Sequence, residues 1–315
     1  MDWVRTFYFI LRKLKRIIIN LLMVKVEIKK GILAISLGSV LLGSIGVFVR
    51  MAGNYFEPMT QSFGRIFFAF VFISILNLAT GKLKNETFAI KKSDLPYFFL
   101  NGIISFSGMA AAFTLSVLYT TITNTYFLLY TAPIFAAILG YVFLRDKITK
   151  QIVIAIILSV FGLVFLFNPS SLTSNLVGNL FGLLTGMFFG AYFVITSFLR
   201  QRYSAPTITF WTQAIGALGL FPLIFIFDRT INLTYSLSEL LPVIAAGLIV
   251  FAGYILLNYG LKKVKASVGS ILSLFEPLSS VVYGLLFFAE LPTGQTLIGA
   301  SLIIVSIVYL TIKQK

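Results

Sequence analysis

The sequence predicts an all-α integral membrane protein, and its composition, its apolar segments and an internal repeat each support this fold class. Hydrophobic residues make up 58% of the 315 positions and charged residues 11%, against roughly half and a quarter in soluble domains. Each membrane crossing needs roughly twenty apolar residues, so little of the chain is left for a soluble domain. The absence of His and Cys excludes thiolate nucleophiles, His-based triads and His/Cys zinc sites. We therefore expect no metal, no cofactor and no enzyme activity.

Ten apolar segments of about twenty residues each are the predicted transmembrane helices. They cover residues 32–49, 59–79, 95–117, 124–144, 151–168, 177–199, 207–227, 240–261, 266–289 and 294–312. Prolines fall at or near segment ends, where a helix tolerates the missing N–H group. These are Pro58, Pro96, Pro169, Pro206, Pro242 and Pro292.

The formal net charge of +15 is better explained by membrane orientation than by nucleic-acid binding. If the N-terminus is inside, nearly all Lys and Arg outside the spans fall in the tails and loops of one face, and only Arg50 and Arg229 face the other side. Cytoplasmic loops carry this excess in membrane proteins. We expect a multi-pass protein of the cell membrane with both termini cytoplasmic, whose partners are the lipid bilayer and a small-molecule substrate and not nucleic acid.

An offset of 144 residues relates the two halves of the chain, as in Pro133 and Pro277. The same offset joins Gly38 to Gly182, Gly46 to Gly190, Gly140 to Gly284, Thr149 to Thr293 and Gln151 to Gln295. We therefore predict two five-helix repeats, residues 31–171 and 172–315. Because five is odd, the second repeat is predicted to be inverted relative to the first, as in many secondary transporters that work by alternating access.

Residues 1–30 stand outside the repeat and form a basic amphipathic segment. Apolar residues recur there at three- and four-residue steps among Arg and Lys, a pattern typical of a helix on an anionic membrane surface. The alternative is that translation begins at Met23.

Motifs in three spans carry a resemblance to a known family. Arg65 lies early in span two, Thr131-Ala132-Pro133 lies in span four, and Phe275-Glu276-Pro277 lies in span nine. With the span ends at residues 143–149 and 287–291, the chain resembles the EamA-like family of the drug/metabolite transporter superfamily over residues 31–312. The resemblance implies export of amino acids, other metabolites or drugs, or in some members import of nucleotides or cofactors. Asp146 and Arg145 depart from the family's usual Glu and Gly at the membrane surface, where we expect no effect on transport.

Arg65 and Glu276 are the charges predicted to lie inside the bilayer, where an unpaired charge costs several kcal/mol. Glu276 falls roughly 15 Å deep and Arg65 roughly 9 Å deep, at 1.5 Å per residue. One interpretation makes Glu276 a proton acceptor or the counter-charge of a substrate amine, with Arg65 holding a substrate carboxylate. The other is a structural ion pair that locks spans two and nine together.

Pro133 and Pro277 are predicted to interrupt spans four and nine near mid-membrane and to free the carbonyls of Leu129 and Ser273. Matched interruptions in the two halves indicate a binding site in transporters, and a packing kink is the alternative.

A moderately polar, aromatic-walled cavity is predicted at these depths, although helix–helix hydrogen bonding explains each residue taken alone. Its candidate lining residues are Asn124, Tyr126, Tyr130, Thr131, Trp211, Gln213, Tyr254, Asn258, Ser270 and Ser273. A second set is a stripe of small residues in span six, for which packing within the bundle is preferred over dimerisation. The stripe comprises Gly178, Gly182, Gly186 and Gly190. The choice between monomer and homodimer stays open.

The sequence thus predicts a secondary-active transporter of small metabolites such as amino acids or drug-like compounds, with Glu276 as the candidate for proton coupling. A facilitative channel or exchanger, and a membrane scaffold without transport, are the alternatives. An intramembrane enzyme would need paired aspartates, and Asp2, Asp94, Asp146 and Asp228 all fall in tails, loops or span ends.

Overall fold

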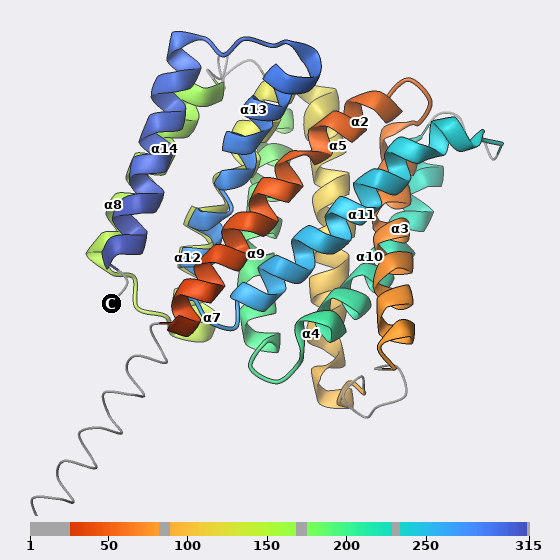
Figure 1. The fold of residues 1–315 in the computed structure, drawn as a ribbon, viewed down its shortest axis with the longest axis horizontal. Helices are drawn as coiled ribbons and strands as arrows, with labels where there is room; N and C mark the ends of the chain where they lie inside the picture. The colour runs from red at the N-terminus through yellow and green to blue at the C-terminus, as the bar shows by residue number, and fades with distance from the viewer. Residues whose placement is uncertain (1–25, 82–88, 168–174, 229–233, 314–315) are drawn as a thin grey trace, which may run out of the picture.

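The computed structural model describes residues 26–81, 89–167, 175–228 and 234–313. Within these ranges every regular element is a helix, and ten helical segments are long and apolar enough to cross a membrane (Figure 1). The predicted fold class, an all-α protein with ten transmembrane helices, is confirmed. Most of the predicted N-terminal segment and the alternative start at Met23 lie outside the described residues.

The ten candidate spans lie within a few residues of the predicted segments. They are Val26–Ala52, Pro58–Ala79, Lys92–Tyr119, Thr123–Leu144, Lys150–Phe167, Leu176–Leu199, Ala205–Phe227, Leu237–Gly260, Ala266–Phe288 and Gly294–Ile312. The first span differs most, because its helix begins by Val26 and not at residue 32, so the last residues of the predicted tail are helical. Apolar length therefore located the spans, while their ends depend on capping and turns that periodicity does not show.

Six spans are single helices and four are divided into shorter ones. The first five single helices are α3 (Pro58–Ala79), α8 (Lys150–Phe167), α9 (Leu176–Leu199), α10 (Ala205–Phe227) and α11 (Leu237–Gly260). The first span ends in α2 (Ile45–Ala52), and the third consists of η3 (Lys92–Asp94), α4 (Leu95–Gly102), η4 (Ile103–Gly108) and α5 (Met109–Tyr119). Span four consists of α6 (Ile122–Leu129) and α7 (Ala132–Leu144), and span nine of α12 (Ala266–Leu272) and α13 (Phe275–Phe288). The chain's last helix is α14 (Gly294–Lys313).

The helices pack as a bundle in which α8 and α14 lie side by side at one edge, while α3, α10 and α11 contact one another at the other (Figure 1). Close approach of α8 and α14 depends on Gly162 and Gly299, which face each other's backbone. A hydrogen bond of 2.8 Å between the buried hydroxyls of Ser159 and Ser306 also joins these two helices. Small side chains thus set the helix spacing, as expected where lipid removes the usual hydrophobic driving force.

The four glycines of the span-six stripe are all buried against α5, α6 and α7 of the same chain. A Cβ atom at Gly186 would lie 2.5 Å from the carbonyl oxygen of Leu128, and one at Gly190 would lie 2.7 Å from Cβ of Phe135. The stripe therefore serves close packing inside the bundle in this structure, and it presents no open small-residue face for a second copy.

Spans four and nine end in the same backbone conformation, 144 residues apart. Arg145 (φ 56°) and Ala289 (φ 55°) are the non-glycine residues with positive φ in the described part of the chain. At each cap, the N–H of the next residue donates across the turn, to the carbonyl of Gly140 at 3.1 Å or of Gly284 at 3.2 Å, a common left-handed helix ending. Figure 1 draws α7 and α13 ending at opposite ends of the bundle.

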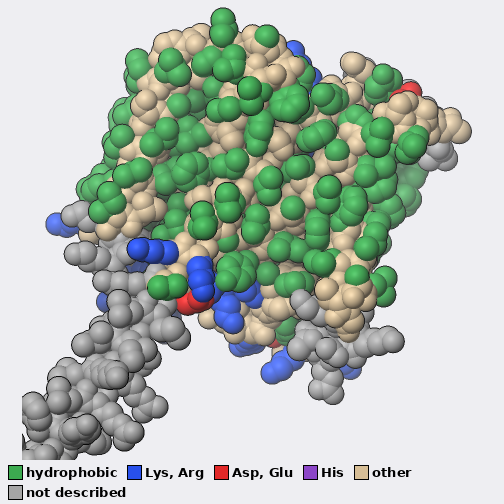
Figure 2. Space-filling model, in the orientation of Figure 1, with side chains coloured by type: hydrophobic (Ala, Val, Ile, Leu, Met, Phe, Trp, Pro, Cys, Tyr) green, Lys and Arg blue, Asp and Glu red, His purple; other side chains and the backbone are tan. Residues whose placement is uncertain are grey.

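The surface of the bundle is apolar across its middle and charged at its ends. Figure 2 shows hydrophobic side chains over most of this face and several Lys and Arg side chains gathered at its lower end. At one end Arg50 pairs with Glu290, and elsewhere Glu27 pairs with Lys30 and Lys263. The apolar middle of the bundle is the kind of surface that a multi-pass membrane protein presents to lipid.

Candidate functional site

The interruptions of spans four and nine lie at corresponding places in the two halves. At each, an N–H bonds three residues back: Thr131 to the carbonyl of Leu128 at 3.2 Å, and Leu274 to the carbonyl of Ile271 at 3.1 Å. These tighter turns separate α6 from α7 and α12 from α13. Irregular backbone at membrane depth is tolerated where it is buried in protein or lines a cavity.

Pro133 and Pro277 lie in the first turns of α7 and α13, where the missing proline N–H leaves no intrahelical bond unmade. The prediction that the carbonyl of Ser273 is free is wrong, because it accepts a hydrogen bond of 2.9 Å from the N–H of Glu276. Pro277 has no N–H to donate to the carbonyl of Ser273 four residues earlier, so the N–H of Glu276, three residues after Ser273, bonds that carbonyl instead. The prolines therefore start the second half-helix of each span.

Glu276 lies in the first turn of α13, in the middle of its span. The positive end of the helix dipole favours a carboxylate at this position. Its side chain lies near that of Tyr130, and Glu276 itself is only partly buried. A carboxylate at this depth that keeps some accessible surface is available to a proton or to a ligand.

Arg65 lies on α3, where its Nη2 donates to the hydroxyl of Ser62 at 3.0 Å. Its Nε is buried without a partner among the described residues. The ion pairs of the described residues include none between Arg65 and Glu276, and α3 packs mainly against α10 and α11. A direct Arg65–Glu276 lock is therefore not the arrangement in this structure.

Tyr126 and Tyr254 lie near both charges, since each interacts electrostatically with Arg65 and with Glu276. Tyr126 also stacks on Tyr130 with ring centroids 6.3 Å apart. The centre of the bundle thus holds a cation, a carboxylate and two tyrosine rings near one another, and the two charges form no ion pair within the described residues. That arrangement offers separate places for a negative and a positive group of one small molecule.

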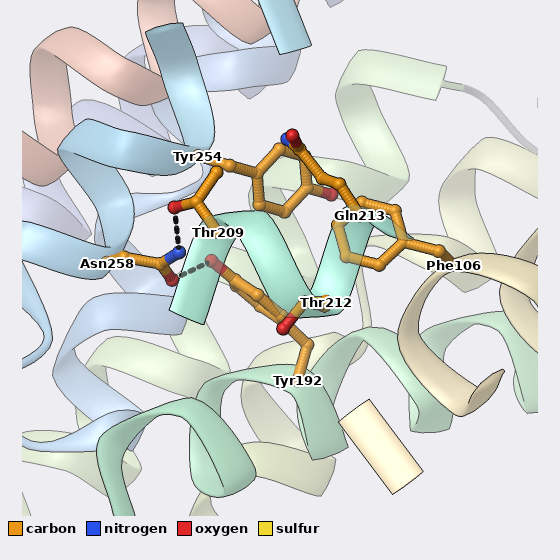
Figure 3. A pocket seen from close by; sticks show the side chains of 7 residues that line it. All are labelled: Phe106, Tyr192, Thr209, Thr212, Gln213, Tyr254 and Asn258. Atoms are coloured by element: carbon orange, nitrogen blue, oxygen red, sulfur yellow. Dashed lines mark hydrogen bonds between the residues drawn. The ribbon is translucent and has the colours of Figure 1, made fainter. Parts of the chain in front are cut away.

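A pocket adjoins this centre through the ring of Tyr254, which it shares (Figure 3). It is lined by Phe106, Tyr192, Thr209, Thr212, Gln213, Tyr254 and Asn258. Phe106 comes from the π-helical segment η4, a wider turn that is frequent at functional sites. Ring centroids lie 4.9 Å apart for Phe106 and Tyr254 and 5.2 Å apart for Tyr192 and Tyr254, so the pocket is narrow.

The polar groups of the pocket differ in how well they are satisfied. The Tyr192 hydroxyl donates to Oδ1 of Asn258 at 2.7 Å, and Nδ2 of Asn258 donates to Oγ1 of Thr209 at 2.8 Å (Figure 3). Gln213, in contrast, is fully buried and neither its oxygen nor its nitrogen has a partner among the described residues. A buried polar group without a hydrogen-bond partner destabilises the folded state by about 1–3 kcal/mol. The Gln213 amide is therefore costly unless another group bonds it.

The structure brings together some of the candidate residues and separates others. Gln213, Tyr254 and Asn258 line the pocket, and Arg65, Tyr126, Tyr130 and Glu276 meet beside it. Trp211 lies away from the pocket, beside a cluster that includes Ile208 and Ile215. Asn124 lies at the start of α6 and donates to the hydroxyl of Thr120 at 3.1 Å. The hydroxyls of Thr131, Ser270 and Ser273 donate to carbonyls three residues earlier in their own chain segments.

Four pocket residues were not predicted: Phe106, Tyr192, Thr209 and Thr212. The spacing of the two threonines could have indicated them, because Thr209 lies three residues before Thr212 and four before Gln213, so the three share one face of a helix. Phe106 and Tyr192 had none, since the chain has 33 Phe and 14 Tyr and helical spacing does not say which of them face a pocket.

A second polar cluster closes one end of the bundle near this pocket. The Tyr203 hydroxyl donates to Asp94 at 2.8 Å, Arg202 donates to the same carboxylate at 2.7 Å, and the N–H of Lys91 donates to the Tyr203 oxygen at 3.1 Å. Burial raises the pKa of the Tyr203 hydroxyl above its ordinary value. Arg200 donates to the carbonyl of Tyr203, and its Nε donates at 2.6 Å to the carbonyl of Asn258. Arg200 therefore joins the cluster to the pocket wall.

Ten spans, two interrupted helices at corresponding positions and opposite charges beside a central pocket define a multi-pass membrane protein of the transporter class. The chain belongs to the EamA-like transporter family, whose family model matches residues 29–168 and again residues 176–312. It is similar to an uncharacterized transporter of Archaeoglobus fulgidus, 28% identical over 279 residues that cover 88% of this chain and 94% of that protein. The protein is thus a membrane transporter.

Two further comparisons agree with this class. The chain is 22% identical to the uncharacterized transporter YoaV of Bacillus subtilis, over 88% of this chain and 94% of that protein. A solved crystal structure shares the fold with a TM-score of 0.75 at 15% identity, covering 88% of this chain and 95% of the other.

Proposed function

We propose that this transporter carries small zwitterionic metabolites, amino acids in particular, across the cell membrane by secondary active transport. The observation that carries the proposal is that Arg65 and Glu276 both lie near Tyr126 and Tyr254 and form no ion pair with each other within the described residues. Arg65 suits a substrate carboxylate and Glu276 a substrate ammonium group. Charges held inside a membrane protein commonly mark a substrate or ion pathway.

Alternating access is proposed between two inverted five-helix repeats, with both termini in the cytoplasm. The matched interruptions, the matched left-handed caps at Arg145 and Ala289, and their position at opposite ends of the bundle support the inversion. The uneven distribution of Lys and Arg supports the orientation. In this scheme the lipid bilayer surrounds the bundle and no nucleic acid is bound.

Proton coupling is proposed to rest on Glu276. The chain has no His, and Glu276 is the carboxylate in the middle of a span. A proton and a substrate ammonium group would compete for this carboxylate, which is a simple way to exchange one for the other. Substrate movement would then drive an opposite movement of protons.

Reconstitution of the purified protein in liposomes tests this function. An amino acid gradient imposed on wild-type liposomes is expected to produce a proton flux that a pH-sensitive dye inside them records. Glu276→Gln is expected to abolish the flux while the protein still inserts, and Glu290→Gln, a change of an exposed carboxylate at the end of the bundle, is expected to leave it unchanged. Equal proton flux in wild type and Glu276→Gln would refute the coupling role.

The alternatives differ in transport kinetics. A carrier or exchanger accelerates uptake of labelled substrate when unlabelled substrate is trapped inside, and a channel does not. A scaffold moves no substrate at all. Saturable counterflow of an amino acid is therefore the expected result, whereas counterflow restricted to drug-like compounds would replace the proposed substrate class.

A further inference from the structure

The polar groups on one wall of the pocket beside the charged centre have hydrogen-bond partners, and the Gln213 amide on the other wall has none in the described part of the chain. Asn258 joins Tyr192 and Thr209 in a closed set of hydrogen bonds. On the other wall neither the oxygen nor the nitrogen of the Gln213 amide makes a hydrogen bond within the described residues. Figure 3 shows the Gln213 amide beside the Tyr254 ring. Buried amides almost always have hydrogen-bond partners in folded proteins. The unpartnered Gln213 amide therefore points to a partner that is not part of the chain.

We propose that this pocket binds the side group of the transported molecule, and that the side group is short, uncharged and able both to donate and to accept hydrogen bonds, as a carboxamide does. The proposal rests on the proposed function, in which the charges of the same molecule lie against Arg65 and Glu276. Tyr254 belongs to both places, so one molecule of amino acid size reaches from the charged centre into the pocket.

The chemistry of Gln213 selects the kind of side group. Its amide offers two N–H donors and one acceptor oxygen, and a carboxamide provides the complementary set. An aliphatic side group of the same shape would leave the buried amide unsatisfied, which is how sites built on hydrogen bonds reject analogues that lack them. A carboxylate side group would bring a second negative charge towards Glu276, which interacts electrostatically with Tyr254.

The rings around the pocket limit the size of the side group. Those of Phe106, Tyr192 and Tyr254 lie against one another, with centroids 4.9–6.5 Å apart. An aromatic side group would have to displace them, whereas a slender carboxamide needs the smaller opening.

Competition between matched amino acids in counterflow tests the proposal. Liposomes with the wild-type protein are expected to exchange glutamine at least about tenfold better than norleucine, its apolar counterpart of similar length, and better than glutamate and phenylalanine. In Gln213→Leu this ratio is expected to fall towards one, because the amide that discriminates is gone. Tyr254→Phe, which removes only a hydroxyl, is expected to lower the ratio as well and keeps the test valid if Gln213→Leu folds poorly.

A matched control is available in Asn77, a second fully buried amide that has no partner among the described residues and is not among the residues lining the pocket. Asn77→Leu is expected to leave the ratio of glutamine to norleucine unchanged. Thermal unfolding gives a second readout, since glutamine is expected to raise the apparent stability of wild type and Asn77→Leu but not of Gln213→Leu.

The failures of the two proposals are distinguishable. If the wild type exchanged glutamine and norleucine equally, or if Gln213→Leu kept the wild-type ratio, the pocket assignment would be overturned while transport of amino acids stood. If the wild type exchanged no amino acid, the proposed function itself would be refuted and this inference with it.

Discussion

Replacement of Gly299 by alanine tests how the α8–α14 contact is built. A Cβ atom there would lie 2.6 Å from the carbonyl oxygen of Gly162 and 2.9 Å from Cα of Leu166, about 1 Å short of ordinary van der Waals separation. Both neighbours are backbone atoms, so no side-chain rotation relieves the clash and the helices must move apart. Overpacking of this kind costs about 1–3 kcal/mol, partly offset by the higher helix propensity of alanine, about 1 kcal/mol.

The same substitution at Gly294 is the control, because it lies on the same helix and a Cβ there would meet nothing within 4 Å. Thermal unfolding of the purified proteins in detergent is the assay. Gly299→Ala is expected to be about 1–2 kcal/mol less stable than wild type, whereas Gly294→Ala is expected to lie within about 0.5 kcal/mol of it. Equal stability of the two variants would refute the close backbone packing of α8 and α14.

Two further predictions concern the ends of the bundle. Tyr203→Phe is expected to cost about 1–3 kcal/mol in thermal unfolding, because buried Asp94 loses a donor and the N–H of Lys91 loses its acceptor; unchanged stability would contradict this. Burial raises the pKa of the Asp146 carboxyl, so the folded state binds this proton more tightly than the unfolded state, and stability falls as pH rises through the folded-state pKa. Asp146→Asn is expected to remove that fall in a pH series of unfolding temperatures, and a fall as large as that of wild type would argue against it.

Sequence reasoning located the spans and the charged residues inside them because both signals are local. A run of about twenty apolar residues has few uses other than crossing a membrane, and a Glu or Arg within such a run is unmistakable. The motifs around Arg65, Pro133 and Glu276 were sufficient to indicate the EamA-like family, to which the chain belongs.

Sequence reasoning did less well where an outcome depends on which helices are neighbours. Depth along a helix placed Arg65 and Glu276 near each other, but α3 packs on α10 and α11 and the two charges form no ion pair in the described part of the chain. Trp211 and Gln213 are only two residues apart, yet only Gln213 lines the pocket. A two-residue step rotates a side chain about 200° around a helix, so the packing of α10 decides which of them faces inward.

The sequence by itself determined the class of protein, the ten spans and the 144-residue correspondence between the halves, because hydropathy, proline and glycine spacing act within single segments. Only the tertiary structure decided that the prolines begin half-helices, that the carbonyl of Ser273 is re-used by the turn before α13, and that two tyrosines lie near both Arg65 and Glu276. It also decided that the Gln213 amide is left without a partner in the described part of the chain. Each of these depends on contacts between segments far apart in the chain, which arise from helix packing and which no local pattern encodes.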